Sequence, residues 1–170
     1  TLSPWRPGMP LHDPMCGTGT LMIEAAMRMA HRAPGLTREF AIESWRNMPT
    51  EAFGDIREQA RAEFDPSRIE GISGSDIDPE AVELANRHLK QAGLAGRVRF
   101  ETADMRDCRR AEPQGVFLCN PPYGERLSDR KACETLYRDM GQMLRANTGW
   151  SLSAITSHPG FERCFGRRAD

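Results

Sequence analysis

The tetrapeptide Asn120-Pro121-Pro122-Tyr123 is the segment whose residue types point most directly to chemistry. The two prolines lack a backbone N–H and hold the chain extended, so only their carbonyl oxygens remain for hydrogen bonding. Asn120 adds a side-chain carbonyl, and Tyr123 adds a flat apolar ring face. A planar amino group on an aromatic base or on an amide matches this set, because it donates two hydrogens and its plane can stack. We therefore predict that these four residues hold a substrate amine; a structural Pro-Pro turn is the alternative.

A second candidate site is segment 13–20, of sequence D-P-M-C-G-T-G-T. Gly17 and Gly19 allow a tight turn and let a ligand approach the backbone closely. A dinucleotide fingerprint would need a third glycine where the chain has Met22, and a P-loop would need a lysine directly after its second glycine. The segment therefore predicts a turn that binds a ligand without phosphate groups, with a purely structural turn as the alternative.

Three aspartates complete the candidate set. Asp76 ends the segment G-I-S-G-S-D, which is expected to be a second strand. An acid at the end of a second strand can accept both hydroxyls of a ribose. Asp78 precedes a proline and is expected to cap a helix beginning there. Asp104, in T-A-D-M-R-D, can accept a hydrogen bond from an adenine amino group, although a simple loop acid is an equal alternative.

The elements that position these residues follow from apolar periodicity. Strands are expected at 10–13, 71–76, 98–102, 115–119 and 150–156, and helices at 20–32, 50–65, 79–92, 133–146 and 161–165. This alternation predicts an α/β fold: a doubly wound, mostly parallel sheet with helices on both faces. Ligands bind such sheets at the carboxyl ends of the strands, and every candidate segment directly follows a strand. Segment 35–50 is irregular, and we expect Phe40 and Trp45 to pack inside.

Composition restricts the class of protein. The net charge is −1 and the pI is about 6.4, whereas an autonomous nucleic-acid-binding protein usually has a basic excess. Two arginine clusters, at 97–110 and 163–168, are as well explained by solvated surfaces. Five cysteines without a C-x-x-C pair and scattered histidines predict reduced thiols and no metal site. No apolar stretch is long enough to span a membrane and no secretory leader is recognisable, so we expect a cytoplasmic protein.

Taken in order, the four segments resemble the class I S-adenosylmethionine (SAM)-dependent methyltransferases of the N-P-P-Y type. The chain is most similar to the RNA guanine-N2 methyltransferases that carry a THUMP domain, the large-subunit methyltransferase L family that modifies 23S ribosomal RNA. This narrower resemblance rests on N-P-P-Y-G-E-R-L at 120–127, the helix around 137–144, and the insert with Ala33-Pro34-Gly35 and Trp45. The family has a THUMP domain and further strands, so residues 1–170 are expected to be an excised catalytic domain, truncated at both ends.

The resemblance implies a role for each matching residue. The target base would contact Asn120, Pro121, Pro122 and Tyr123. The cofactor would contact the following residues: Asp13, Pro14, Cys16, Gly17, Thr18 and Gly19 toward its methionine end, Asp76 at the ribose, Ile77, Asp104 and Met105 at the adenine, and Asn120. The implied reaction transfers a methyl group from SAM to the N2 amine of an RNA guanine.

Several other functions remain open. The N-P-P-Y motif is shared with adenine-N6 methyltransferases and with protein glutamine methyltransferases. An NAD-dependent oxidoreductase is disfavoured by Met22 and by the N-P-P-Y segment, and a non-catalytic RNA-binding module is disfavoured because all four motifs are intact. The implied partner is RNA, bound through the THUMP domain that this chain lacks, with no membrane and no metal.

Overall fold

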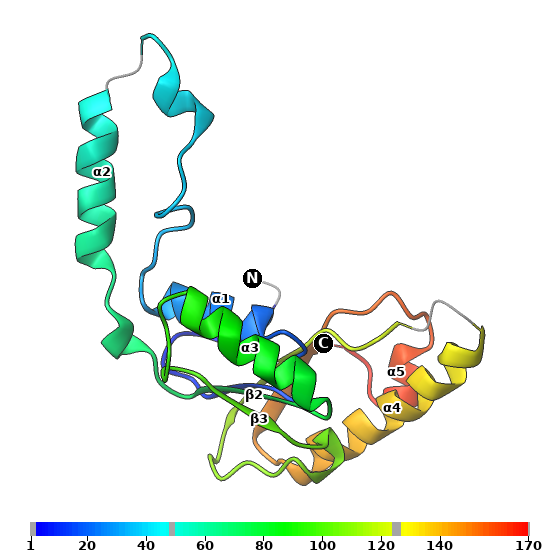
Figure 1. Cartoon of the computed structure of the whole chain (residues 1–170). Helices are drawn as coiled ribbons and strands as arrows, with labels where there is room; N and C mark the ends of the chain where they lie inside the picture. Colours follow the sequence, from blue (N-terminus) through cyan, green and yellow to red (C-terminus); the bar gives the residue numbers. More distant parts are fainter. Residues whose placement is uncertain (1–2, 48–49, 124–126, 170) are drawn as a thin grey trace.

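The sheet of this protein contains five parallel strands in the order β3-β2-β1-β4-β5 (Figure 1). The computed structural model describes residues 3–47, 50–123 and 127–169. The strands are β1 (Leu11–Asp13), β2 (Ile72–Asp76), β3 (Arg99–Thr102), β4 (Gly115–Cys119) and β5 (Trp150–Ala154). The predicted strands and the parallel α/β class are therefore confirmed. The strand order reverses direction between β1 and β4, which is the topological switch point where doubly wound sheets bind ligands.

Helices cover both faces of the sheet (Figure 1). The covering helices are α1 (Thr20–Met29), α3 (Pro79–Gln91), α4 (Leu127–Ala146) and α5 (Phe161–Phe165), whereas α2 (Thr50–Glu63) stands away from the sheet. The 3-10 turns are η1 (Ala41–Ser44), η2 (Pro66–Arg68) and η3 (Met105–Asp107). Side chains alternate along each strand, so Val116 packs into a core with α1 and α3 while Phe117 packs into a second core with α4 and α5. Within the described residues, no helix is long and apolar enough to cross a membrane.

Helix boundaries differ from the prediction at two places. Helix α1 ends at Met29, before the predicted end at residue 32, because Ala30 caps it and His31 adopts a left-handed φ of 54°. Helix α4 begins at Leu127 rather than near Cys133, so it follows the N-P-P-Y segment almost directly. This early start places the first turns of α4 beside the candidate site.

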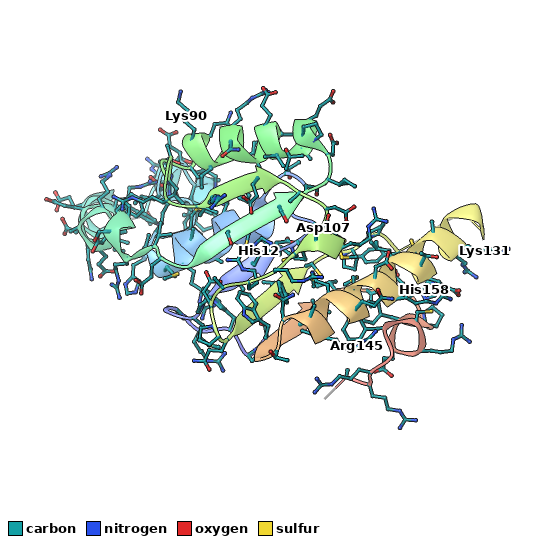
Figure 2. All side chains as sticks on the ribbon, turned by 90° about the horizontal axis from the view of Figure 1, so that it is seen from below. His12, Lys90, Asp107, Lys131, Arg145 and His158 are labelled. Atoms are coloured by element: carbon teal, nitrogen blue, oxygen red, sulfur yellow. The ribbon has the colours of Figure 1, made fainter. Side chains whose placement is uncertain are left out.

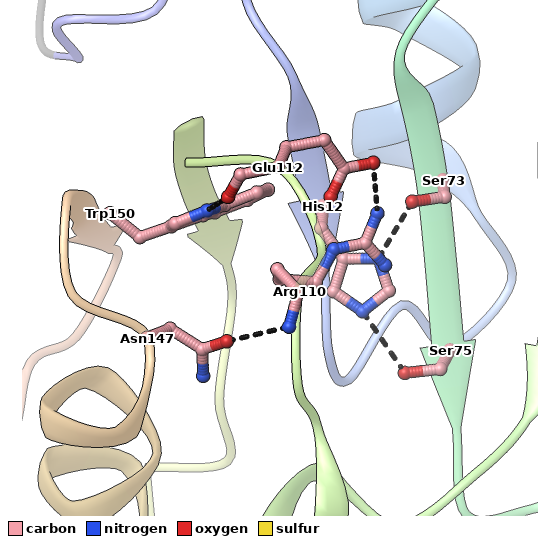
Figure 3. A network of polar contacts seen from close by, with 7 residues as sticks. All are labelled: His12, Ser73, Ser75, Arg110, Glu112, Asn147 and Trp150. Carbon is pink, nitrogen blue, oxygen red and sulfur yellow. Dashed lines mark hydrogen bonds and ion pairs between the residues drawn. The ribbon is translucent and has the colours of Figure 1, made fainter. Parts of the chain in front are cut away.

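A polar network fills the α4 side of the sheet below the site (Figure 3). His12 of β1 is buried between the hydroxyls of Ser73 and Ser75, at 2.9 and 3.3 Å. Burial lowers the pKa of His12 to about 3, so the ring is neutral and its two nitrogens can serve one as donor and one as acceptor. Asn147, directly after α4, accepts a hydrogen bond from the backbone N–H of Arg110 at 2.7 Å. The His12 contacts join β1 to β2, and the Asn147 contact joins the end of α4 to the segment that precedes β4.

The insert between α1 and β2 projects from the body as an arm (Figure 1). None of the side chains described between residues 33 and 68 is buried. Arg57 of α2 joins the two limbs by donating to the carbonyls of Leu36 and Arg38 and by pairing with Glu43. The expectation that Phe40 and Trp45 pack inside is wrong: they are 37% and 64% exposed, because the arm carries them away from both cores.

Candidate cofactor and methyl-acceptor site

A cleft of about 640 Å³ opens at the carboxyl edge of the sheet, beside the switch point. It is lined by the segments that follow β1, β2, β3 and β4 and by one face of α4. The structure thus brings all four predicted segments to one place. The predicted site residues that line the cleft are Pro14, Asp76, Ile77, Asp104, Met105, Asn120 and Pro122.

Asp13, Cys16 and Pro121 lie buried behind the cleft wall. Asp13 is 2% exposed, and one of its carboxylate oxygens accepts a hydrogen bond from the Met15 N–H at 3.0 Å. Burial raises the pKa of Asp13 to about 7, with a smaller contribution from the nearby Asp76 charge. Burial also raises the pKa of Cys16 to about 12, so its thiol stays neutral. Asp13 and Cys16 therefore shape the turn from within.

Gly17 and Gly19 are glycines for different structural reasons. Both have left-handed backbones, with φ of 52° at Gly17 and 81° at Gly19. A Cβ at Gly17 would meet nothing within 4 Å, so the space beside it is open. A Cβ at Gly19 would lie 2.8 Å from Phe100 and 3.0 Å from Ala85, so this glycine lets α1 pack closely on α3 and β3. Thr18 lies between them and is exposed.

Asp76 connects the first two segments. One carboxylate oxygen accepts from the Gly17 N–H at 2.8 Å, and the other accepts from the Asp78 N–H at 3.0 Å. Asp78 in turn accepts from the Glu80 N–H at 2.9 Å, which confirms it as the cap of α3. Each Asp76 oxygen keeps further lone pairs for a ligand hydroxyl. Beside it Ile77 is 65% exposed and offers an apolar surface at the cleft.

Asp104 and Arg106 form the third part of the wall. Asp104 caps η3 by accepting from the Arg106 N–H at 2.9 Å, and it also pairs with the Arg106 guanidinium. Hydrogen bonds from the Arg106 side chain and then its backbone lower the pKa of Asp104, so the carboxylate is charged. Arg106 belongs in the sequence to a basic cluster that a solvated surface explains equally well, but in the structure it lines the cleft.

The N-P-P-Y segment contributes Asn120 and Pro122 to the wall of the same cleft. Asn120 is exposed, and its side-chain oxygen accepts a hydrogen bond from the Tyr123 hydroxyl. The hydroxyl of Tyr137, on α4, donates to the Pro122 carbonyl at 2.7 Å. The G-E-R continuation at 124–126 lies outside the described residues.

One face of α4 forms the remaining wall and was missed in the sequence. Its cleft-lining residues are Ala132, Thr135, Leu136 and Asp139, at the i, i+3, i+4, i+7 spacing of one helical face. The spacing is readable in the sequence, and Thr135, Leu136 and Asp139 lie within the predicted helix, but only the fold shows that this face borders the cleft.

The donors and surfaces of the cleft fit a nucleoside-containing cofactor. Carboxylates follow β2 and β3, the apolar side chains of Ile77 and Met105 lie beside them, and the space beside Gly17 is open. This arrangement at the switch point defines a Rossmann-like methyltransferase site. Among the described residues, no group of three or more His, Cys, Asp or Glu side chains could hold a metal ion.

Comparison with known proteins gives the family. The family model described as "RMKL-like, methyltransferase domain" matches residues 1–170. The chain therefore belongs to the RMKL-like methyltransferase family, and its cofactor is SAM.

Relatives and solved structures agree with this assignment. The chain is 38% identical, over 96% of its length, to the ribosomal RNA large subunit methyltransferase K/L of Legionella pneumophila. It is 36% identical, over 99% of its length, to a Bacillus subtilis protein assigned as the RNA methyltransferase YpsC. It spans only 23% and 44% of these two relatives.

Among solved structures, SMU.472, assigned as a methyltransferase and crystallised with S-adenosylhomocysteine (SAH), superposes with a TM-score of 0.93 at 39% identity. That superposition covers 99% of this chain and 45% of SMU.472. A Listeria monocytogenes protein assigned as an N6-adenine-specific DNA methylase superposes with a TM-score of 0.92 at 38% identity, over 99% of this chain and 44% of its own.

Proposed function

We propose that residues 1–170 form the catalytic domain of an RNA methyltransferase that transfers a methyl group from SAM to the exocyclic N2 amine of a guanine in 23S ribosomal RNA. The observation that carries the proposal is the position of the N-P-P-Y segment. Asn120 and Pro122 line the same cleft as Asp76 and Asp104, so amine acceptors share one cleft with the residues suited to the cofactor's ribose and adenine. A substrate amine held by the segment therefore faces the cofactor.

The cofactor residues have separate tasks in this proposal. The carboxylate of Asp76 accepts from the ribose hydroxyls, and that of Asp104 accepts from the adenine amine. Ile77 and Met105 contact the flat faces of the adenine. Pro14 lines the cleft, and the open backbone at Gly17 and Thr18 admits the methionine end, while the buried Asp13, Cys16 and Gly19 keep the turn in shape.

SAM supplies a methyl group on a sulfonium, which is already a good leaving group. The chain's contribution is to prepare the nucleophile, because an exocyclic amine shares its lone pair with the aromatic ring. If Asn120 Oδ1 and the Pro121 carbonyl accept the two amine hydrogens, the nitrogen can become pyramidal and direct its lone pair at the methyl carbon. Positioning of this kind lowers barriers by several kcal/mol.

The hydrogen bond between Tyr123 and Asn120 bears on how Asn120 Oδ1 receives the substrate amine. The Tyr123 hydroxyl occupies the same Asn120 oxygen that the amine needs. That oxygen has a second lone pair, so it can accept from the amine while it keeps the Tyr123 hydroxyl, and the Tyr123 ring can stack on the base. Asn120 cannot act as a general base, so the proton leaves to water after transfer.

An RNA target agrees with the need to bring a base into the cleft, with the charge of the chain and with its relatives. Bases in RNA loops and bulges are already unstacked, so flipping one into the cleft costs less than from a helix. With a net charge of −1, the chain is expected to depend on a THUMP domain for most of its RNA affinity. The K/L relatives support ribosomal RNA as the substrate, and such a substrate places the reaction in the cytoplasm.

Adenine-N6 methylation is the second candidate. It is favoured by the Listeria neighbour, which is assigned as an adenine methylase. The N-P-P-Y segment would hold either amine in the same way. Protein glutamine N5-methylation uses the same acceptors but draws no support from the RNA methyltransferase relatives.

Labelled SAM and short single-stranded RNAs test the proposal. The RNAs carry one guanine, one inosine, which lacks only the N2 amine, or one adenine. Ribosomal RNA from a strain without the gene is labelled in parallel, and the modified nucleoside is identified after digestion; both this chain and the complete gene product are assayed. The proposal predicts label in guanine but not inosine, as N2-methylguanosine. N6-methyladenosine would move the substrate to the second candidate, and label only in a glutamine peptide would refute an RNA substrate.

A further inference from the structure

Tyr137 is a buried residue of α4 that touches the N-P-P-Y segment from behind. Its side chain is fully buried, and its hydroxyl donates a hydrogen bond of 2.7 Å to the Pro122 carbonyl. Burial raises the pKa of Tyr137, so the hydroxyl keeps its proton and can act as this donor. The contact joins a long helix packed in the second core to the segment that holds the substrate.

The ring of Tyr137 is fixed by aromatic neighbours. His158 and Phe161 contact it edge-on, with ring centroids at 5.3 and 4.8 Å. His158 lies beside α4 (Figure 2), and its own ring is held because Nδ1 accepts from the Gly160 N–H at 3.1 Å. The hydroxyl of Tyr137 therefore has a set position.

The two prolines make this contact important. Neither proline has an N–H, so each can form a backbone hydrogen bond only through its carbonyl oxygen. Tyr137 takes the Pro122 carbonyl and turns it toward α4. Among the described residues, no hydrogen bond to the Pro121 carbonyl is found.

We infer that Tyr137 is a positioning residue for methyl transfer: by holding the Pro122 carbonyl, it sets the rotation of the N-P-P-Y segment that leaves Asn120 Oδ1 and the Pro121 carbonyl for the substrate amine. This inference rests on the proposed role of the segment. It does not depend on which amine is methylated.

Tyr137→Phe tests the inference because it removes the hydroxyl and keeps the packed ring. Loss of one neutral hydrogen bond in the transition state predicts a kcat lowered about three- to tenfold. KM for SAM and the SAH dissociation constant, measured by calorimetry, stay within about twofold because the cofactor contacts are untouched. In ¹H–¹⁵N spectra, the Tyr123 backbone amide and the Asn120 side-chain amide shift.

Ser73→Ala is the matched control. It also removes one hydroxyl, which bonds His12 at 2.9 Å, and Ser73 does not line the cleft. If the Tyr137 hydroxyl only stabilises the fold, Tyr137→Phe lowers kcat no more than Ser73→Ala does when the two variants lose the same Tm. Unchanged kcat in Tyr137→Phe, or equal kcat losses in both variants, would overturn the inference.

A different methyl acceptor leaves the test intact. If the wild type methylates adenine or glutamine, the proposed substrate fails, and the same kcat comparison is made on that acceptor. If it methylates nothing, the spectra decide: unchanged Tyr123 and Asn120 resonances in Tyr137→Phe refute the inference, and selective shifts support it.

Discussion

Replacing Gly17 by alanine separates cofactor binding from backbone strain. A Cβ at Gly17 would enter open space, in a backbone with φ of 52°. The left-handed conformation costs an L-residue about 1 kcal/mol. In our account that open space receives the methionine end of SAM, so the added methyl group collides with the cofactor and not with the protein. Overpacking of one methyl costs about 1–3 kcal/mol, which predicts SAH binding weakened by about 5- to 150-fold.

Two other glycines provide the comparison. Gly96 has φ of 74° and equally open surroundings but belongs to none of the four segments at the carboxyl edge of the sheet, so Gly96→Ala should show similar strain and normal SAH binding. Gly19→Ala adds a clash with Phe100 to its strain and should lose about 2–5 kcal/mol of stability. Urea unfolding and calorimetry with SAH measure both quantities. The reasoning is refuted if Gly17→Ala binds SAH as tightly as Gly96→Ala does.

Two further substitutions test the acids of the site. Asp76→Asn removes the charge and one of the acceptors for the Gly17 and Asp78 N–H groups, so SAH binding should weaken by about tenfold or more. The control Asp78→Asn still caps α3 and should bind SAH normally. Equal losses of SAH affinity in the two variants, measured by calorimetry, would contradict a ribose role for Asp76. Asp13→Asn tests the buried carboxyl, whose pKa rises from 3.8 in the unfolded chain to about 7 in the folded protein. The free energy of unfolding of the wild type is therefore undiminished below the unfolded pKa and falls as the pH rises through the folded pKa. Denaturation between about pH 4 and pH 8 should therefore show the variant gaining a few kcal/mol relative to wild type as pH rises, and a constant difference would show that Asp13 does not hold its proton.

Local chemistry was enough to predict the framework and four of the site's walls. The apolar run of β4, the Asp78-Pro79 start of α3 and the glycines after β1 are short-range signals, and parallel strands necessarily bring their following segments to one edge. The exposure of Phe40 and Trp45 was not predictable in this way, because apolar character does not reveal whether a core is within reach.

The missed site residues depend on distant contacts. Tyr137 reads in the sequence as an ordinary core residue of α4, and only the fold places its hydroxyl against Pro122. Arg106 reads as a surface base until η3 turns it back onto Asp104. Asp13 reads as a ligand, but its carboxyl is buried behind the turn it shapes.

Replacing Asn120 by alanine tests the central claim most directly. The variant loses the acceptor that we assign to the substrate amine, while Asp76, Asp104 and the Gly17 turn remain. The measurement is methyl transfer from labelled SAM beside SAH affinity on the same preparation. The account predicts that transfer is lost while SAH affinity stays within a few-fold of wild type. Unchanged transfer by Asn120→Ala would contradict the role assigned to the N-P-P-Y segment.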